Sequence, residues 1–306
     1  MISMTASCGK WWRGLSVALT LACAVSCPAD VCAATPSAVA LRDDRGHEQV
    51  FDVPPQRIVS LLPSLTESIC ALGGCAKLVG TDRYSSWPAS VNPLPKLGGL
   101  EDTQIERIVA LRPDVVLTAP SSRVIDKLES LGLRVLVLEP QTHGDVQRSL
   151  QLLATMLGTP SAAAPLWADI ERDVALASAR VPAALRGQRV YFEIDSTPYA
   201  AGEGSFIGQT LVRLAMTNAV PASLGPFPKL NPEFIVRAQP DVVMAAAASL
   251  TEMPGRPGWS GLRALRESRV CGFQPAQYDL LVRPGPRLGE AALALADCLV
   301  AIHSHP

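Results

Sequence analysis

This chain of 306 residues has no excess of charge of either sign beyond a single unit, and it has few aromatic side chains and few histidines. Lysine and arginine number 27 against 28 aspartates and glutamates, so the chain lacks the basic face of a dedicated nucleic-acid or anionic-membrane binder. Beyond the N-terminus, no apolar run reaches the roughly 18 residues of a membrane span. Hydrophobic residues make up 48% of the chain and charged residues 18%, which excludes a disordered protein and permits a large core, in one large or two medium domains.

Sequence signatures of catalysis and metal binding are also missing. The chain has no G-x-S-x-G nucleophile elbow. The segment Gly202–Gly208 misses the G-x-G-x-x-G spacing by one residue and lacks the lysine of a P-loop. Only 4 histidines are present, and no two of the later cysteines form a C-x-x-C pair. We therefore expect no enzymatic activity, no cofactor and no metal site; an exported two-lobed enzyme is the alternative from another class.

The N-terminus has the order of a secretory signal peptide. Lys10 and Arg13 precede an apolar stretch, Gly14–Cys27, and small residues follow at Cys32–Ala34. We predict a signal peptide over residues 1–34 and export to the periplasm. Cys27 follows A-V-S, which is a poor lipobox, so soluble export is favoured over a lipid anchor.

Four cysteines remain beyond the predicted signal peptide, and they are Cys70, Cys75, Cys271 and Cys298. An even number in an oxidising compartment suggests disulfides, and four cysteines allow three pairings. Pairing the cysteines locally, Cys70 with Cys75 and Cys271 with Cys298, keeps each bridge within one half of the chain. Buried free thiols are the alternative.

Strand and helix patterns alternate in both halves of the chain, which predicts two α/β lobes with parallel sheets. The predicted strands are Arg57–Leu62, Leu78–Gly80, Val115–Thr118, Arg134–Leu138, Arg189–Ile194, Val242–Ala245 and Arg269–Phe273. Between the halves lie two helical stretches, and the second, Ala162–Arg180, would be roughly 28 Å long, enough to lie along both lobes. We predict Rossmann-like lobes over residues 35–143 and 185–306, joined by a long helix within residues 144–184.

An internal repeat supports this division. The pattern E-x-I-V-x-x-x-P-D-V-V begins at Glu106 and again at Glu233, at a constant offset. In each copy a helix, a proline stop and a buried strand follow in the same order, which suggests two lobes built from one unit.

Three segments of the first half, R-I-V-S-L-x-P-S-x-T-E, V-G-x-D-x-Y-S-x-W-P and I-E-R-I-V-A-L-R-P-D, carry a resemblance to a known family. They begin at Arg57, Val79 and Ile105, and the second repeat copy and Pro286-Arg287 add to them. Over Arg57–Leu299 the chain resembles the helical-backbone (class III) periplasmic substrate-binding proteins of ABC importers for vitamin B12, ferric siderophores and haem. The vitamin B12-binding proteins are the most similar group.

The resemblance implies a monomer with a ligand cleft between its lobes, and an ABC permease with its ATPase subunits as the partner. The transported ligand would be cobalamin or a related corrinoid; haem or a ferric siderophore is the alternative. Glu106 and Glu233 would dock onto permease arginines. Each also has a structural explanation, because Glu106 completes a T-x-x-E capping box and Glu233 follows Asn231-Pro232.

Candidate ligand contacts lie in loops after the predicted strands, because ligands of parallel sheets bind beyond the carboxyl ends of the strands. They are Ser64, Tyr84 and Trp87 in the first lobe and Tyr199, Phe227 and Arg283 in the second. Aromatic rings offer stacking surfaces to a large flat ligand, and Arg83, Arg283 and Arg287 could pair with an anionic one. Where the B12-binding relatives place further tryptophans, this chain has Leu100 and Ala119.

Overall fold

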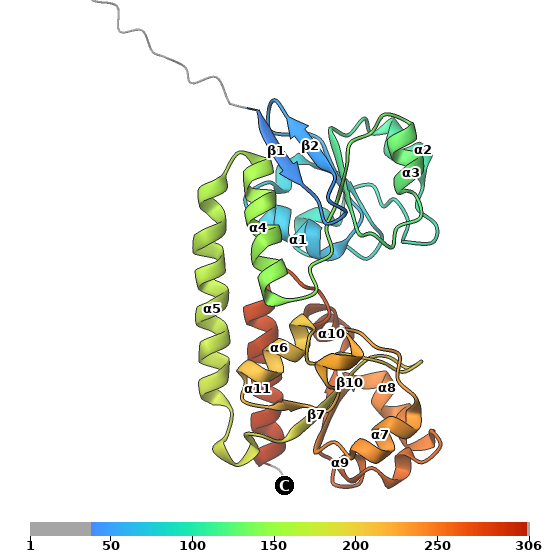
Figure 1. The fold of residues 1–306 in the computed structure, drawn as a ribbon, viewed down its shortest axis with the longest axis vertical. Helices are drawn as coiled ribbons and strands as arrows, with labels where there is room; N and C mark the ends of the chain where they lie inside the picture. The colour runs from blue at the N-terminus through green and yellow to red at the C-terminus, as the bar shows by residue number, and fades with distance from the viewer. Residues whose placement is uncertain (1–37, 305–306) are drawn as a thin grey trace, which may run out of the picture. The chain divides into compact units, whose positions relative to one another are not determined.

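A computed structural model describes residues 38–304, so the predicted signal peptide lies outside the described residues. Figure 1 shows two lobes, each built around its own sheet. The first sheet is parallel, with strand order β4-β3-β5-β6. Its strands and helices are β3 (Ile58–Ser60), α1 (Pro63–Ala71), β4 (Leu78–Thr81), α2 (Ile105–Ala110), β5 (Val115–Thr118), α3 (Ile125–Ser130) and β6 (Val135–Val137). The four strands predicted for this half are confirmed.

The second sheet is mixed rather than purely parallel. The strands β11, β10, β7 and β9 run parallel, but the two-residue β8 pairs with β7 in the antiparallel direction. The elements are β7 (Arg189–Asp195), β8 (Tyr199–Ala200), α6 (Phe206–Arg213), β9 (Thr217–Asn218), α7 (Pro232–Ala238), β10 (Val242–Ala246), α8 (Ala247–Glu252), α9 (Arg263–Arg266), β11 (Val270–Phe273), α10 (Pro275–Leu281) and α11 (Leu288–Ser304). The prediction missed β8 and β9 because two residues are too few to show a strand period.

An antiparallel hairpin precedes the first sheet. It consists of β1 (Val39–Arg42) and β2 (Glu48–Phe51), and Asp43 closes its turn by accepting hydrogen bonds from the backbone of Arg45 and His47. Leu41 and Phe51 are buried in the core, and the hairpin packs against α4 (His143–Leu157). The sequence analysis had assigned no structure to this segment.

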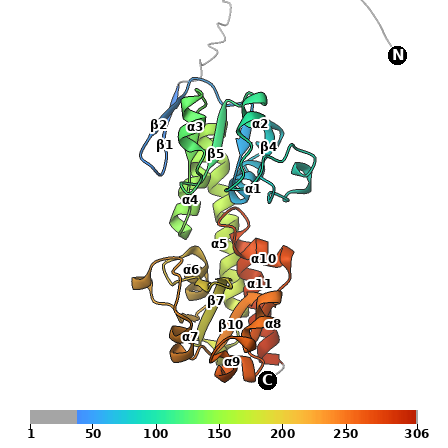
Figure 2. The ribbon, with the colours of Figure 1, turned by 90° about the vertical axis from the view of Figure 1, so that its right-hand side faces the viewer.

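The predicted long helix is present as α5 (Ala163–Arg180). It packs against α4, which follows the first lobe, and against α6 and α11 of the second lobe. Figure 1 shows α5 beside the two lobes, and Figure 2 shows it behind them. A capping box between Thr142 and Asp145 begins α4, and Gly158 ends it with a φ of 79°. Glycine suits this left-handed position because a side chain there is strained.

The sequence repeat is also a repeat of structure. In both copies a short helix, α2 or α7, leads through one residue with positive φ to the proline and then to a central strand. These residues are Arg112, with φ 45°, and Gln239, with φ 42°, at the same repeat position. A non-glycine residue with positive φ is uncommon, so its occurrence at both positions shows that the two lobes reverse the chain in the same way.

The aspartate that follows each proline anchors the neighbouring strand. The Asp114 carboxylate accepts from the backbone N–H of Arg57 at 2.8 Å, and the Asp241 carboxylate accepts from that of Arg189 at 2.9 Å. Both arginines lie where their sheet begins, Arg57 just before β3 and Arg189 as the first residue of β7. The spacing shared by the two repeat copies therefore places an aspartate beside the start of a neighbouring strand in each lobe.

The S-x-x-E pattern of Ser64 and Glu67 predicts a capping box at the start of α1, as the T-x-x-E pattern at Glu106 does for α2, and both predictions are wrong. At α1, Pro63 starts the helix after Leu62, so Ser64 lies inside the first turn and makes no cap. Its buried hydroxyl has no hydrogen-bond partner within residues 38–304. At α2 the cap residue is Gln104, and Thr103 instead donates to the carbonyl of Gly99. An S/T-x-x-E pattern does not locate the start of a helix by itself, because the helix can begin one or two residues away from the predicted cap.

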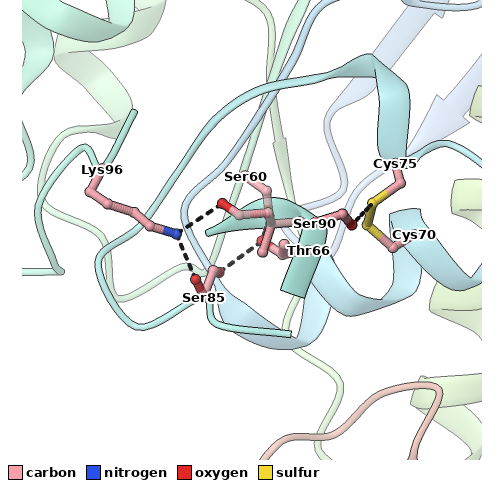
Figure 3. Close-up of a disulfide and its surroundings, with 8 residues drawn as sticks. Ser60, Thr66, Cys70, Cys75, Ser85, Ser90 and Lys96 are labelled. Carbon is pink, nitrogen blue, oxygen red and sulfur yellow. Dashed lines mark hydrogen bonds between the residues drawn. A yellow bond between two sulfur atoms is a disulfide. The ribbon is translucent and has the colours of Figure 1, made fainter. Parts of the chain in front are cut away.

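The predicted cap of α7 and the local disulfide pairing are confirmed. Asn231 accepts from the backbone N–H of Glu233 at 2.9 Å. Disulfides join Cys70 to Cys75 and Cys271 to Cys298, so the free-thiol alternative is wrong (Figure 3 shows the first). The second disulfide ties β11 to α11 in the second lobe.

Candidate functional site

A cavity of about 750 Å³ lies between the two lobes. Its first-lobe wall follows the ends of β3, β4, β5 and β6, as expected for the carboxyl ends of parallel strands. First-lobe residues of the wall are Leu62, Pro63, Ser64, Tyr84, Leu100, Ala119, Ser121, Glu139, Pro140 and Gln141. The facing wall is made by Ile194, Phe206, Phe227, Asp279, Val282, Arg283 and Pro284.

Four of the six candidate contacts lie on this wall, namely Ser64, Tyr84, Phe227 and Arg283. Trp87 lies instead at a contact between the lobes, where the guanidinium carbon of Arg287 is 4.7 Å from the centre of its ring. Tyr199 is exposed and pairs with Lys229 through the backbone, outside the residues that line the cavity.

Leu100 and Ala119, the positions at which the resemblance to the B12-binding group led us to expect tryptophans, both belong to the cavity wall. The smaller side chains leave this side of the cavity wider and with fewer aromatic surfaces than two tryptophans would give.

Three residues of the cavity wall, Glu139, Gln141 and Phe206, are not among the predicted contacts. Glu139 and Gln141 directly follow a predicted strand, so the carboxyl-end rule used for the other loops could have found them. Phe206 lies within the segment Gly202–Gly208, which was considered as a phosphate loop, and it is the first residue of α6. Its N–H donates to the carbonyl of Gln141 at 2.6 Å, and this bond joins the two lobes at the cavity wall.

Aromatic rings face the cavity from both lobes. Tyr84 is 60% exposed on the first-lobe side. On the second-lobe side the rings of Phe206 and Phe227 are tilted against each other, with centroids 5.9 Å apart. Aromatic surfaces on opposite walls suit a flat ligand held between them.

A buried polar network supports the loop that carries Tyr84. The Asp82 carboxylate accepts from the backbone N–H groups of Tyr84 at 2.7 Å and Ser85 at 3.0 Å, and the Ser85 hydroxyl contacts the same carboxylate. The Ser85 hydroxyl also lies 2.9 Å from that of Thr66, which donates to Ser60 (Figure 3). Burial raises the pKa of Asp82 above its usual value, although these hydrogen bonds counteract the shift.

Lys96 completes this network from the next segment of the chain. Its ammonium donates to the carbonyl of Ser85 at 2.7 Å (Figure 3). It also donates to the Thr81 hydroxyl at 3.0 Å. Burial lowers the pKa of Lys96, and the Asp82 carboxylate counteracts this. The ammonium therefore joins the loop that carries Tyr84 to the end of β4.

Replacing Lys96 by methionine is expected to lower the free energy of unfolding by about 1–3 kcal/mol, because the stem still packs but buried oxygens lose their donor. Faster amide hydrogen exchange is expected at Tyr84 and Ser85. Chemical denaturation and exchange measured by mass spectrometry would test both effects. Lys127→Met, at an exposed position of α3, is the matched control; equal exchange in the two variants would show that Lys96 does not support the loop.

An ion pair joins the lobes at the cavity wall. Arg283, in the segment between α10 and α11, donates to the Glu67 carboxylate of α1 at 2.9 Å and to the Tyr84 carbonyl at 3.0 Å. It also donates to Asp279 at 2.6 Å. The side chains of Glu67 and Arg283 are only 2% and 9% exposed. Burial raises the pKa of Glu67, and the facing guanidinium counteracts this.

The other arginines considered for an anionic ligand also have protein partners. Arg83 pairs with Asp102. Arg287 pairs with Glu290 at 3.2 Å and covers the ring of Trp87. Together with the three partners of Arg283, these contacts leave none of the three guanidinium groups unpaired.

The two glutamates of the repeat are both exposed in the first turns of short helices. Glu106 belongs to α2 and Glu233 to α7. Glu233 lies 3.8 Å from Arg237 on the same helix, and both side chains are more than 70% exposed. Both carboxylates are therefore open to a partner.

No cluster of three or more histidine, cysteine, aspartate or glutamate side chains within residues 38–304 could hold a metal ion. In the same residues, no helix has the length and apolar character of a membrane span.

Comparison with known proteins identifies the family. A family model described as periplasmic binding protein matches residues 58–276. The Bacillus subtilis protein YvrC, named an uncharacterized ABC transporter substrate-binding lipoprotein, is 28% identical over 269 residues, covering 84% of each chain. The vitamin B12-binding protein of Pectobacterium carotovorum is 24% identical over 257 residues, covering 81% of this chain and 90% of the relative. The structure of the periplasmic heme-binding protein RhuT from Roseiflexus sp. RS-1 matches with a TM-score of 0.68 and 25% identity, covering 81% of this chain and 98% of RhuT. The chain therefore belongs to the periplasmic binding protein family and is a substrate-binding protein.

Proposed function

We propose that this protein is exported to the periplasm, captures vitamin B12 or a related corrinoid, and delivers it to the permease of an ABC importer. One observation carries the proposal: a cavity of about 750 Å³ with Tyr84 on one wall and Phe206 and Phe227 on the other. Flat macrocycles bind between such surfaces, with a few polar groups fixing their orientation. The relatives named for B12 binding support the same ligand.

Haem is the second candidate because relatives of the same fold bind it. Haem iron needs an axial ligand from histidine, cysteine, methionine or tyrosine. Among the residues that line the cavity, the Tyr84 hydroxyl is the one group of this kind. A corrin brings its own metal and lower ligand, so it places no such demand on the wall. The missing tryptophans at Leu100 and Ala119 count against a B12 site built like that of the relatives, but the paired phenylalanines offer a replacement surface.

Titration calorimetry with cyanocobalamin, haemin and a ferric siderophore in parallel cells tests the proposal. We expect saturable one-to-one binding of cyanocobalamin and recovery of the unmodified ligand, since a binding protein performs no turnover. Replacing Tyr84 or Phe227 by alanine should weaken binding about tenfold, because a stacking contact contributes roughly 1.4 kcal/mol. Tyr199→Ala is the matched control, because it removes an aromatic ring outside the cavity wall. Binding of haemin or a siderophore without cobalamin would overturn the corrinoid assignment.

A further inference from the structure

The charge left unpaired on the cavity wall is negative. Three charged side chains line the cavity: Glu139, Asp279 and Arg283. Arg283 is engaged with Glu67, Asp279 and the Tyr84 carbonyl, so it offers little positive charge to a ligand. The carboxylate of Glu139 forms no ion pair or hydrogen bond with another residue in the described range, and the side chain is exposed.

Four cations near the cavity, Arg83, Arg123, Arg287 and Lys96, are held by other groups. Arg83 and Arg123 belong to loops beside wall residues, and they pair with Asp102 and Glu101. Arg287 is held by Glu290 and lies over the Trp87 ring. Lys96 donates into the network beneath the Tyr84 loop rather than into the cavity.

A carboxylate can only accept hydrogen bonds, so it favours ligands that present N–H or O–H donors and repels ligands that present carboxylates. Gln141, two residues along the same wall, adds a side chain that can both donate and accept. A corrinoid carries primary amides around its rim, whereas haem carries two propionates. The charge of the wall thus separates two ligands that its aromatic surfaces would accept equally.

We infer that Glu139 is a specificity-determining residue that selects ligands with an amide-bearing rim and rejects ligands with carboxylates. The inference deepens the proposed function and rests on it for the identity of the binding cavity.

The sharpest test compares cyanocobalamin with its monocarboxylic acids, in which one rim amide has become a carboxylate. Shape is nearly constant between the two, so the affinity ratio reports charge. The wild-type protein is expected to bind cyanocobalamin at least tenfold more tightly than one or more of the isomeric acids. Glu139→Gln should bring this ratio close to one, and Glu139→Lys should invert it. Glu48→Gln, at an exposed position of β2, is the matched control and should keep the wild-type ratio.

The affinity for haemin tests the role of Glu139 in a way that does not depend on corrinoid binding. Glu139→Lys is expected to bind haemin more tightly than the wild type, and high salt should reduce the difference because it screens exposed charges. Ratios that are the same in the wild type and both Glu139 variants, for the acids and for haemin, would overturn the inference. No cobalamin binding together with charge-dependent haemin binding would instead overturn the corrinoid assignment and leave the role of Glu139 standing.

Discussion

Replacing Glu67 by alanine is expected to lower the free energy of unfolding by about 3 kcal/mol, one of the two largest effects that the structure predicts. The Glu67 carboxylate and the Arg283 guanidinium are both buried, and they join α1 of the first lobe to the segment that precedes α11 in the second. Removing one partner of a buried pair leaves an uncompensated charge, at a cost of roughly 3–5 kcal/mol. Because Arg283 keeps its hydrogen bonds to Asp279 and Tyr84, we expect a loss of stability at the lower end of this range.

Urea denaturation followed by circular dichroism measures this change. Asp169→Ala removes an exposed ion pair with Arg172 on α5 and is the matched control, with an expected cost of at most about 1 kcal/mol. The double variant Glu67→Leu/Arg283→Met should recover much of the loss, because apolar groups can replace a buried ion pair at little cost. Equal midpoints for Glu67→Ala and Asp169→Ala would show that the lobes do not depend on this pair.

Reversing both repeat glutamates, in Glu106→Lys/Glu233→Lys, is expected to abolish transport while ligand affinity stays within about twofold. The two carboxylates are exposed at matching positions of α2 and α7, away from the residues that line the cavity. If they contact permease arginines, each reversal replaces an attraction by a repulsion. Losing a charged contact of this kind costs roughly 2 kcal/mol or more, which is about 30-fold in affinity per site.

The measurements are uptake in cells that carry the transporter, binding of the purified protein to the permease complex, and ligand titration of the variant. Glu48→Lys/Glu252→Lys changes the net charge equally at exposed positions outside the repeat and should transport normally. Each single reversal should give an intermediate loss. Normal transport by Glu106→Lys/Glu233→Lys would show that the two acids serve only the first turns of their helices.

The elements that follow from local patterns were predicted well. The strand Val115–Thr118 has the predicted bounds, and the helix Pro232–Ala238 begins directly after the predicted cap Asn231. Their signals are apolar runs, prolines and a cap within a few residues, and backbone hydrogen bonding acts over the same distance. The segments that were missed are short or depend on a distant surface, as β1 and β2 depend on the core beneath them.

Which side chains line the cavity does not follow from local sequence patterns. Tyr84 and Trp87 lie three residues apart in one loop and were predicted to share one role, yet Tyr84 lines the cavity and Trp87 lies under Arg287. Which of the two faces the cavity depends on how the second lobe packs against the loop. No pattern within the loop encodes the position of Arg287.

The sequence by itself determined the two α/β lobes, the repeated helix-proline-strand unit and the family resemblance. The lobes and the repeated unit depend on periodicity and spacing, and the resemblance depends on particular motifs; short segments carry all of these independently of the rest of the chain. Only the tertiary structure decided that Glu67 pairs across the lobes instead of capping a helix, and that Arg283 has little charge to offer a ligand. Glu67 and Arg283 are 216 residues apart, and at that separation the physical environment of a side chain is set by packing, burial and partners that no local pattern records.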